Sequence, residues 1–494
     1  MKAKYSLLSL VMASSALASA PCPASAPQAT QTQPNILFIF ADDHVYESMG
    51  RLGSAVKTPH LDALAQSGTH YVRAYNQGAW AGAVCVASRT QLMTGRGLWD
   101  AFRYHEQAVE AQRDDGTDIQ LPTSWPQRMS DLGYDTYITG KWHVKAYDFK
   151  TVFDERGLVR DRGMPNTKGD HNRPIQGQPD TWNPADPSLQ GYWRGGTHWS
   201  VGTANDAIEY LEQRSDADQP FFAYIAFNAP HDPRQSPQEY LDMYPLEDIP
   251  LPPAYMESYP YTEELGIARI RGEGLAPTPR TEFAIKTHRK EYYALVSHLD
   301  TQIGRIMDSL EAQGLADNTI VIYSADHGLS LGNHSFMTKQ SMYDHSLAAP
   351  LIIAGPGIEQ GVTSQQRVYI QDVMPTALSI AGAKPEQLQD VIFSNLLPES
   401  PEAQAQLAQR PIYGGFRDNS RMVVEDGWKL MIYPQADKLR LFDLTADPHE
   451  LDDRADEPKQ QARIKAMVQT LLNEQKKMND PMDLRPQLSQ LGVL

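Results

Sequence analysis

Short apolar runs alternate with amphipathic stretches through most of this chain, and this alternation limits the possible folds more than any other feature. Apolar runs suited to strands buried on both faces lie at residues 35–40, 134–140, 220–228, 318–326 and 349–357. Helical patterns lie between them, the clearest at residues 124–133, 203–214, 282–314 and 371–382. This order predicts an α/β fold, with a mainly parallel central sheet flanked by helices on both faces.

The pattern changes near residue 395. Residues 395–411 have the composition of a connector, and residues 421–434 and 438–453 predict short antiparallel strands ahead of a final helix near residues 459–478. We therefore expect a main α/β domain at residues 34–394. A smaller C-terminal α+β domain, containing an antiparallel sheet, would occupy residues 395–494.

The first residues have the features of a targeting segment. Lys2 and Lys4 precede an apolar run, and Ala16 and Ala18 have the spacing of a cleavage signal. The pattern predicts a signal peptide at residues 1–18 and a flexible lead-in at residues 19–33, and hence export to the periplasm or the medium. No later stretch reaches the roughly 20 apolar residues that a membrane helix needs, so we expect no membrane span.

The charge balance restricts the partners. With 44 basic and 61 acidic residues, the chain has a formal net charge of -17, which opposes general binding to nucleic acid. Any anionic substrate must therefore be held by a local cluster of positive groups. The sequence does not define a self-association surface, and the oligomeric state stays open.

Polar residues of the ligand type follow four of the predicted strands. They are Asp42 and Asp43 after the first strand, Lys141 and His143 after the second, His231 after the third, and Asp326 and His327 after the fourth. Because open parallel sheets carry their sites beyond the carboxyl ends of the strands, we expect these side chains to converge on one pocket.

A lone cysteine raises a separate question. Cys22 lies in the lead-in, so Cys85 has no disulfide partner in the expected fold, although exported proteins usually pair their cysteines. Cys85 lies at the start of a helix-like stretch, where the helix dipole favours an anion, and Arg89 lies one turn further on. From the residues alone, Cys85 is either a buried free thiol or a reactive or modified residue.

Several motifs, matched in order between residues 35 and 452, resemble those of type I sulfatases of the alkaline phosphatase superfamily. The stretch "CVASR" with "TQLMTGR" after it resembles the signature in which the family's cysteine is converted to formylglycine. "NILFIFADD", "TGKWH", "FNAPHDP", "SADHG" and "LFDLTADPHEL" resemble further motifs of that family. The resemblance implies a sulfatase domain at residues 34–394 and a maturation enzyme as a partner.

The resemblance also implies a metal site. It assigns one divalent cation, usually calcium in this family, to Asp42, Asp43, Asp326 and His327. Three carboxylates suit a hard cation that prefers oxygen, whereas a histidine nitrogen is a less natural ligand for calcium. The sequence therefore leaves the identity of the divalent cation open.

The catalytic roles follow from the same resemblance. Cys85, as hydrated formylglycine, would attack sulfur with help from Arg89, His231 would protonate the leaving oxygen, and His143 would take a proton from the second hydroxyl group. Lys141, His231 and Lys339 would hold the sulfate oxygens. On this interpretation Cys85 is a precursor and not a thiol.

Ala87 departs from the family signature, which usually has proline two residues after the cysteine. Some maturation systems accept alanine, so we expect conversion of Cys85. Without it, the chain would be a non-catalytic protein that binds sulfated glycans. Related enzymes with the same nucleophile hydrolyse phosphodiesters or phosphonate monoesters, which is the alternative within enzymes.

The substrate is inferred from a polar insertion at residues 150–200, in which basic residues and tryptophans are interleaved. Aromatic faces stack on sugar rings, and basic groups meet neighbouring sulfates. The candidates for substrate binding are Arg173, Trp193, Arg194, His198 and His334. The pattern, together with a similarity to bacterial sulfatases of marine polysaccharides, favours a sulfated carbohydrate such as carrageenan.

Overall fold

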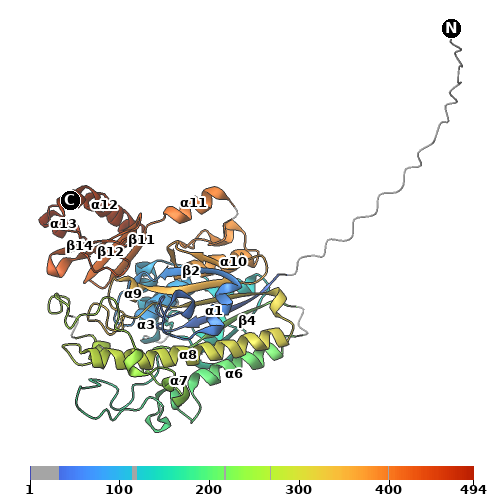
Figure 1. Ribbon diagram of the computed structural model, residues 1–494. Coiled ribbons are helices and arrows are strands. Elements are labelled where there is room, and N and C mark those ends of the chain that lie inside the picture. Colours follow the sequence, from blue (N-terminus) through green and yellow to red (C-terminus); the bar gives the residue numbers. More distant parts are fainter. Residues whose placement is uncertain (2–32, 114–118, 216–218, 267–268, 399) are drawn as a thin grey trace. The chain divides into compact units, whose positions relative to one another are not determined.

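The computed structural model describes Met1 and residues 33–494 without 114–118, 216–218, 267–268 and 399, and residues 33–494 belong to one compact unit (Figure 1). The predicted signal peptide at residues 1–18 and the lead-in at residues 19–33 lie outside the described residues, apart from Met1 and Gln33. Among the helices that are described, none combines the length and the apolar character needed to cross a bilayer.

A mainly parallel sheet forms the centre of the unit, as the alternation of strands and helices predicts. Within the described residues its order is β10-β2-β8-β7-β1-β6-β4-β5, with β9 against β2. The strands are β1 (Asn35–Ala41), β2 (Gly68–Tyr75), β4 (Asp135–Lys141), β5 (Glu155–Arg160), β6 (Phe221–Ala226), β7 (Thr319–Ala325), β8 (Ala348–Ala354), β9 (Val362–Ser364) and β10 (Val368–Tyr369). Only β8 runs against its neighbours β2 and β7 in this described sheet.

The register of the central strands aligns their carboxyl ends. Ala41 at the end of β1 pairs with Ala325 at the end of β7, and Phe40 pairs with Ala226 at the end of β6. Gly140 of β4 also pairs with Ala226. The residues that follow these four strands therefore start from one edge of the sheet.

Helices cover the sheet in two layers (Figure 1). In one layer α1 (Pro59–Gln66), α6 (Trp199–Glu212) and α7 (Gln238–Asp242) pack against the long α8 (Glu282–Ala312). In the other, α2 (Val84–Thr94) packs against α3 (Leu98–Arg113), α4 (Trp125–Asp131) and α10 (Val373–Ile380). The remaining helices ahead of the C-terminal sheet are α5 (Phe149–Val152), α9 (Asp344–Leu347) and α11 (Pro401–Gln409).

Local sequence explains where several of these helices begin. Ser124 and Gln127 form a capping box at the start of α4. The Thr281 side chain accepts a hydrogen bond from the Ala284 amide at the start of α8. Both devices satisfy amide groups that have no partner within the first turn of a helix.

A second, smaller sheet lies near the C-terminus, in the order β14-β13-β12-β11-β3 among the described residues. It consists of β11 (Ile412–Phe416), β12 (Ser420–Glu425), β13 (Trp428–Tyr433) and β14 (Lys438–Asp443), which run antiparallel, and of β3 (Gly78–Ala79), which runs parallel to β11. The helix α12 (Gln461–Lys477) packs on this sheet, and α13 (Arg485–Gln490) follows it (Figure 1). The predicted boundary between residues 394 and 395 stays a prediction.

Gly140 provides a test of how tightly the strand ends are packed. Gly140 and Gly133 have nearly the same φ, 89° and 90°. At Gly140 an added Cβ would lie 1.8 Å from the Ala226 carbonyl oxygen, whereas at Gly133 it would have no atom within 4 Å. We expect Gly133→Ala to lower the free energy of unfolding by about 1–2 kcal/mol through its φ alone. Gly140→Ala should lower it by about 2 kcal/mol more, or prevent folding, because β4 and β6 must separate. Urea denaturation of both variants measures the difference, and equal losses would contradict it.

Candidate active site

The aligned strand ends bring the predicted polar residues together. Asp42 and Asp43 follow β1, Asp326 and His327 follow β7, and all four side chains are buried. The backbone amide of Asp43 donates a hydrogen bond to the Asp326 carboxylate at 3.2 Å, which joins the two strand ends directly. The predicted convergence of these residues is therefore present in the structure.

Each of the three buried carboxylates has one buried cation as its partner. Asp42 pairs with Lys141, Asp43 pairs with Lys339 at 2.7 Å, and Asp326 pairs with Arg89 at 2.9 Å. Pairing lowers the cost of burying each charge, which is several kcal/mol for an isolated ion. The three pairs balance in charge, and His327 and His231 also lie within ion-pair distance of these carboxylates, so the pocket is attractive to an anion.

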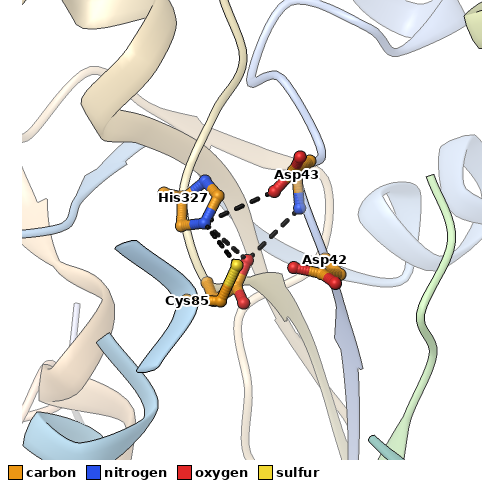
Figure 2. Close-up of side chains that lie close together, drawn as sticks. Asp42, Asp43, Cys85 and His327 are labelled. Atoms are coloured by element: carbon orange, nitrogen blue, oxygen red, sulfur yellow. Dashed lines mark hydrogen bonds and ion pairs between the residues drawn. The ribbon is translucent and has the colours of Figure 1, made fainter. Parts of the chain in front are cut away.

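Cys85 is the second residue of α2, and its thiol points at this cluster (Figure 2). Its Sγ lies 3.2 Å from Nζ of Lys339 and 3.3 Å from Nε2 of His327. Nε2 of His327 is also 3.4 Å from carboxylate oxygens of Asp43 and Asp326. Residue 85 therefore contacts Lys339 and His327, and its sulfur lies within 4.8 Å of carboxylate oxygens of Asp42, Asp43 and Asp326.

The surroundings of Cys85 favour a negative charge on it. Burial opposes ionisation, but Lys141, Lys339, His327 and a hydrogen bond with His143 together hold the pKa of the Cys85 thiol well below its ordinary value. Burial likewise opposes a positive charge on His327, but Asp326, Asp43 and Cys85 together outweigh it and raise the pKa of His327 to about 9. The site thus stabilises an anion at residue 85 and a cation beside the carboxylates.

The carboxylate cluster fits a metal ion. Ligand atoms of Asp42, Asp43, Cys85, Asp326 and His327 lie within 4.8 Å of one another. Oδ1 of Asp42 is buried and has no hydrogen-bond partner among the described residues. A buried acceptor with this geometry suits a cation that takes oxygen ligands.

Arg89 acts behind the pocket. Its guanidinium is fully buried, pairs with Asp326, and donates hydrogen bonds to the carbonyl oxygens of Lys141 and Ala41 and to the Tyr224 hydroxyl group. Arg89 therefore ties the ends of β1, β4 and β7 to α2. Each nitrogen of its guanidinium already has a partner in the protein. Its predicted help to the nucleophile at residue 85 stays a prediction.

His143 and His231 stand beside Cys85 at the surface of a cavity. His143 follows β4 with φ of 58°, and burial lowers its pKa to about 4. Burial opposes protonation of His231 as well, yet Asp232 and Asp43 raise its pKa to about 10. Nε2 of His231 is 3.9 Å from Asp43, and its Nδ1 donates to the Asp232 carbonyl oxygen at 2.8 Å. One histidine is thus neutral and the other protonated.

The cavity has a volume of about 870 Å³. Cys85, His143, His231 and Lys339 line it, whereas Asp42, Asp326, Lys141 and Arg89 are buried behind these residues. Further lining residues come from the segment after β5, from residues 263–266, 269, 270 and 272, and from turns of the C-terminal sheet. A ligand of several rings fits a cavity of this size.

The five predicted substrate-binding residues lie elsewhere. Arg173 pairs with Asp180 and Glu291, and His198 caps α6. His334 stacks on Tyr343 with ring centroids 3.8 Å apart, Nε1 of Trp193 donates to the Pro184 carbonyl oxygen, and Arg194 is exposed. None of the five is among the described residues that line the cavity, and their role in substrate binding stays a prediction.

Sequence reasoning missed other residues of the cavity. Gln340 donates a hydrogen bond to the Gly82 carbonyl oxygen at 2.8 Å and so holds the loop ahead of Cys85. Arg417 and Asn419 come from the turn between β11 and β12. Gln340 directly follows Lys339, so its place at the cavity could have been inferred from that of Lys339. No pattern in the sequence links the turn that carries Arg417 and Asn419 to Cys85.

Two family models match the chain. The model described as "Sulfatase" matches residues 34–383, and the model described as "N-sulphoglucosamine sulphohydrolase, C-terminal" matches residues 332–477. The chain belongs to the sulfatase family. It is therefore a sulfuric ester hydrolase, as its motifs predict.

Curated relatives cover nearly the whole sulfatase chain. An arylsulfatase of Clostridium perfringens is 26% identical in an alignment of 474 positions, which covers 90% of this chain and 94% of the relative. An ulvan-active sulfatase of Formosa agariphila is 26% identical over 441 residues, 86% of this chain and 78% of the relative.

Solved structures share the fold. Ps i-CgsB in complex with k-i-k-neocarrahexaose has a TM-score of 0.63 at 23% identity and covers 90% of this chain and 92% of its own. A phosphonate monoester hydrolase of Agrobacterium radiobacter has a TM-score of 0.66 at 21% identity and covers 90% of this chain and 96% of its own.

Removal and return of divalent cations tests the carboxylate cluster. We expect a divalent cation at a hundred times its Kd to raise the free energy of unfolding of the metal-free protein by about 2.7 kcal/mol. Asp42→Asn should abolish this increment, because a ligand with an unpaired oxygen is lost. Asp317→Asn, which alters an exposed carboxylate, should retain it. Thermal or urea unfolding with and without cation gives the increment, and an equal increment in both variants would argue against the site.

Proposed function

We propose that this sulfatase hydrolyses a sulfate ester of a sulfated carbohydrate, with Cys85 converted to formylglycine as its nucleophile. The observation that carries the proposal is the position of Cys85 at a cavity, in contact with Lys339 and within 4.8 Å of a cluster of three carboxylates. A stable free thiol does not require a polar pocket of this kind, because buried structural cysteines usually behave as small apolar residues.

We assign the metal site to calcium, held by Asp42, Asp43 and Asp326 with His327 beside them. The carboxylates supply the oxygen ligands that calcium prefers, and the free Oδ1 of Asp42 is available to it. When bound, the cation would supply Lewis-acid stabilisation of the negative charge that develops on the reacting oxygens.

Hydrated formylglycine supplies two hydroxyl groups on one carbon. Attack of one hydroxyl oxygen on sulfur breaks the bond from sulfur to the sugar oxygen and leaves the sulfate on residue 85. Removal of the proton from the other hydroxyl group then re-forms the aldehyde and expels sulfate, and addition of water restores the diol. A serine or a thiol in this position has no second hydroxyl group for this elimination.

The residues around the cavity divide the proton transfers between them. His231, protonated beside Asp232, is placed to give its proton to the leaving sugar oxygen. His143 is neutral and hydrogen-bonded to residue 85, so it is placed to accept the proton of the second hydroxyl group. Lys339 faces the cavity and offsets charge on the sulfate oxygens, and Lys141 acts from behind through Asp42.

The proposed substrate is an algal or related polysaccharide or oligosaccharide such as carrageenan. The cavity volume of about 870 Å³ exceeds what a sulfate group alone requires. The relatives named for ulvan and solved with a neocarrahexaose support this class. The proposal includes export through the predicted signal peptide and conversion of Cys85 by a maturation enzyme that accepts Ala87.

Conversion of Cys85 is the first test. Expressed with a formylglycine-generating enzyme, the protein should yield a peptide in which the CH2SH group of residue 85 is replaced by CHO, as read by mass spectrometry. Cys85→Ala should lower the rate of sulfate release by about 10⁴-fold or more, because the covalent route is lost. An unmodified thiol throughout would leave a glycan-binding protein.

Faster turnover of aryl phosphate diesters or phosphonate monoesters than of aryl sulfate would establish the alternative hydrolase activity.

The role of His231 is tested with leaving groups of different acidity. Oligosaccharides of carrageenan, ulvan and glycosaminoglycans are compared with 4-nitrophenyl sulfate for sulfate release. We expect release from at least one glycan, and a loss of about 10²–10⁴-fold on that glycan in His231→Gln. The loss on 4-nitrophenyl sulfate should be far smaller, because nitrophenolate leaves without a proton. An equal loss on both substrates would show that His231 does not protonate the leaving oxygen.

A further inference from the structure

The cavity extends well beyond the nucleophile, and its outer wall carries arginines that the proposed reaction does not use. Arg162 follows β5, and Arg417 lies in the turn between β11 and β12. Both side chains line the cavity and are exposed. They lie far apart in the sequence and next to strands of different sheets.

Arg417 is held close to the loop that leads to Cys85. An added Cβ at Gly82 would lie 3.4 Å from Nη2 of Arg417, so the guanidinium lies directly beside this loop. The turn that carries Arg417 is tied down by Asn419, whose side chain donates to the Leu265 carbonyl oxygen at 2.8 Å. The position of Arg417 at the cavity is therefore built into the fold.

Neither arginine forms an ion pair within the described part of the chain. Among the residues that the structure describes, no carboxylate lies within ion-pair distance of Arg162 or Arg417. Arg162 lies near two other arginines, Arg160 and Arg194. Burial, together with the positive charges of Arg162 and Arg194, lowers the pKa of Arg160. Cations that line a cavity without a counter-charge are suited to an anion brought by the ligand.

We propose that Arg162 and Arg417 form an anion subsite that binds a second sulfate or carboxylate group of the substrate, next to the sulfate ester that is cleaved. The inference rests on the proposed function and deepens it. The planar guanidinium fork matches the paired oxygens of either group. The preferred substrate is then a glycan with at least two anionic groups, and a small neutral alcohol sulfate is a poor one.

Acidic residues on the wall define where the second anion binds. Glu263 and Glu264 line the same cavity and are exposed. Their carboxylates repel an anion but accept hydrogen bonds from sugar hydroxyl groups. The second anion therefore binds at Arg162 and Arg417, and uncharged parts of the glycan fit beside the two glutamates.

Binding to the full-length Cys85→Ala protein tests the subsite without turnover. Isothermal titration compares κ- with ι-carrageenan tetrasaccharides, which differ by an additional sulfate group on each repeat. It also compares a sulfated chondroitin disaccharide with its analogue in which the carboxyl group is reduced. We expect the additional anion in at least one pair to tighten Kd by about tenfold or more, and Arg417→Gln or Arg162→Gln to remove most of that gain. The pair that responds identifies sulfate or carboxylate as the ligand.

Controls separate the subsite from a general effect of charge or folding. Arg417→Lys keeps the charge without the fork and should retain part of the gain. Arg485→Gln removes an exposed arginine of α13 and should retain all of it. The subsite is absent if the additional anion changes Kd by less than about threefold in both pairs, or if Arg417→Gln weakens both members of a pair equally. If the protein releases sulfate but the additional anion does not tighten Kd, the subsite alone is overturned. If the additional anion tightens Kd but no sulfate is released, the proposed function alone is overturned.

Discussion

Three carboxylates buried at adjacent strand ends, each paired with one buried cation, are the constraint on which the rest of the site depends. Asp42, Asp43 and Asp326 pair with Lys141, Lys339 and Arg89, which come from β4, from the loop after β7, and from α2. Loss of one partner would leave an unpaired charge in the interior, which typically costs 3–5 kcal/mol. The cluster therefore holds these separate segments in one arrangement, and that arrangement places Cys85 beside Lys339.

The cavity above this cluster is shared between the two sheets. Its inner wall comes from residues at the strand ends of the central sheet, and its outer wall includes Arg417 from the C-terminal sheet. The pairing of β3 with β11 connects these parts, since β3 lies a few residues before Cys85. The reacting group and the residues that meet the rest of the substrate are thus fixed relative to each other. Under the proposed function, the inner wall would serve the sulfate chemistry and the outer wall would select the glycan.

Burial explains where the residue-by-residue predictions separated from the structure. Arg89 was expected to reach an anion from the first turn of α2, but its donors are used by Asp326 and by two backbone carbonyl groups. Arg173 resembles a substrate ligand in a polar insertion, yet two carboxylates neutralise it inside the protein. The sequence patterns also did not indicate β2 and α3. The apolar residues of β2 are interrupted by Arg73 and by the buried His70, and α3 has few buried residues.

The sequence by itself determined the order of strands and helices, the polar residues that follow each central strand, and the family to which the chain belongs. These features depend on local composition and on spacing along the chain, so they can be read without coordinates. Only the tertiary structure decided which cation pairs with which carboxylate, and which arginines face the cavity without a partner. Those properties depend on distances between residues as far apart in sequence as Gly82 and Arg417, and such distances are set by the pairing of strands across the two sheets.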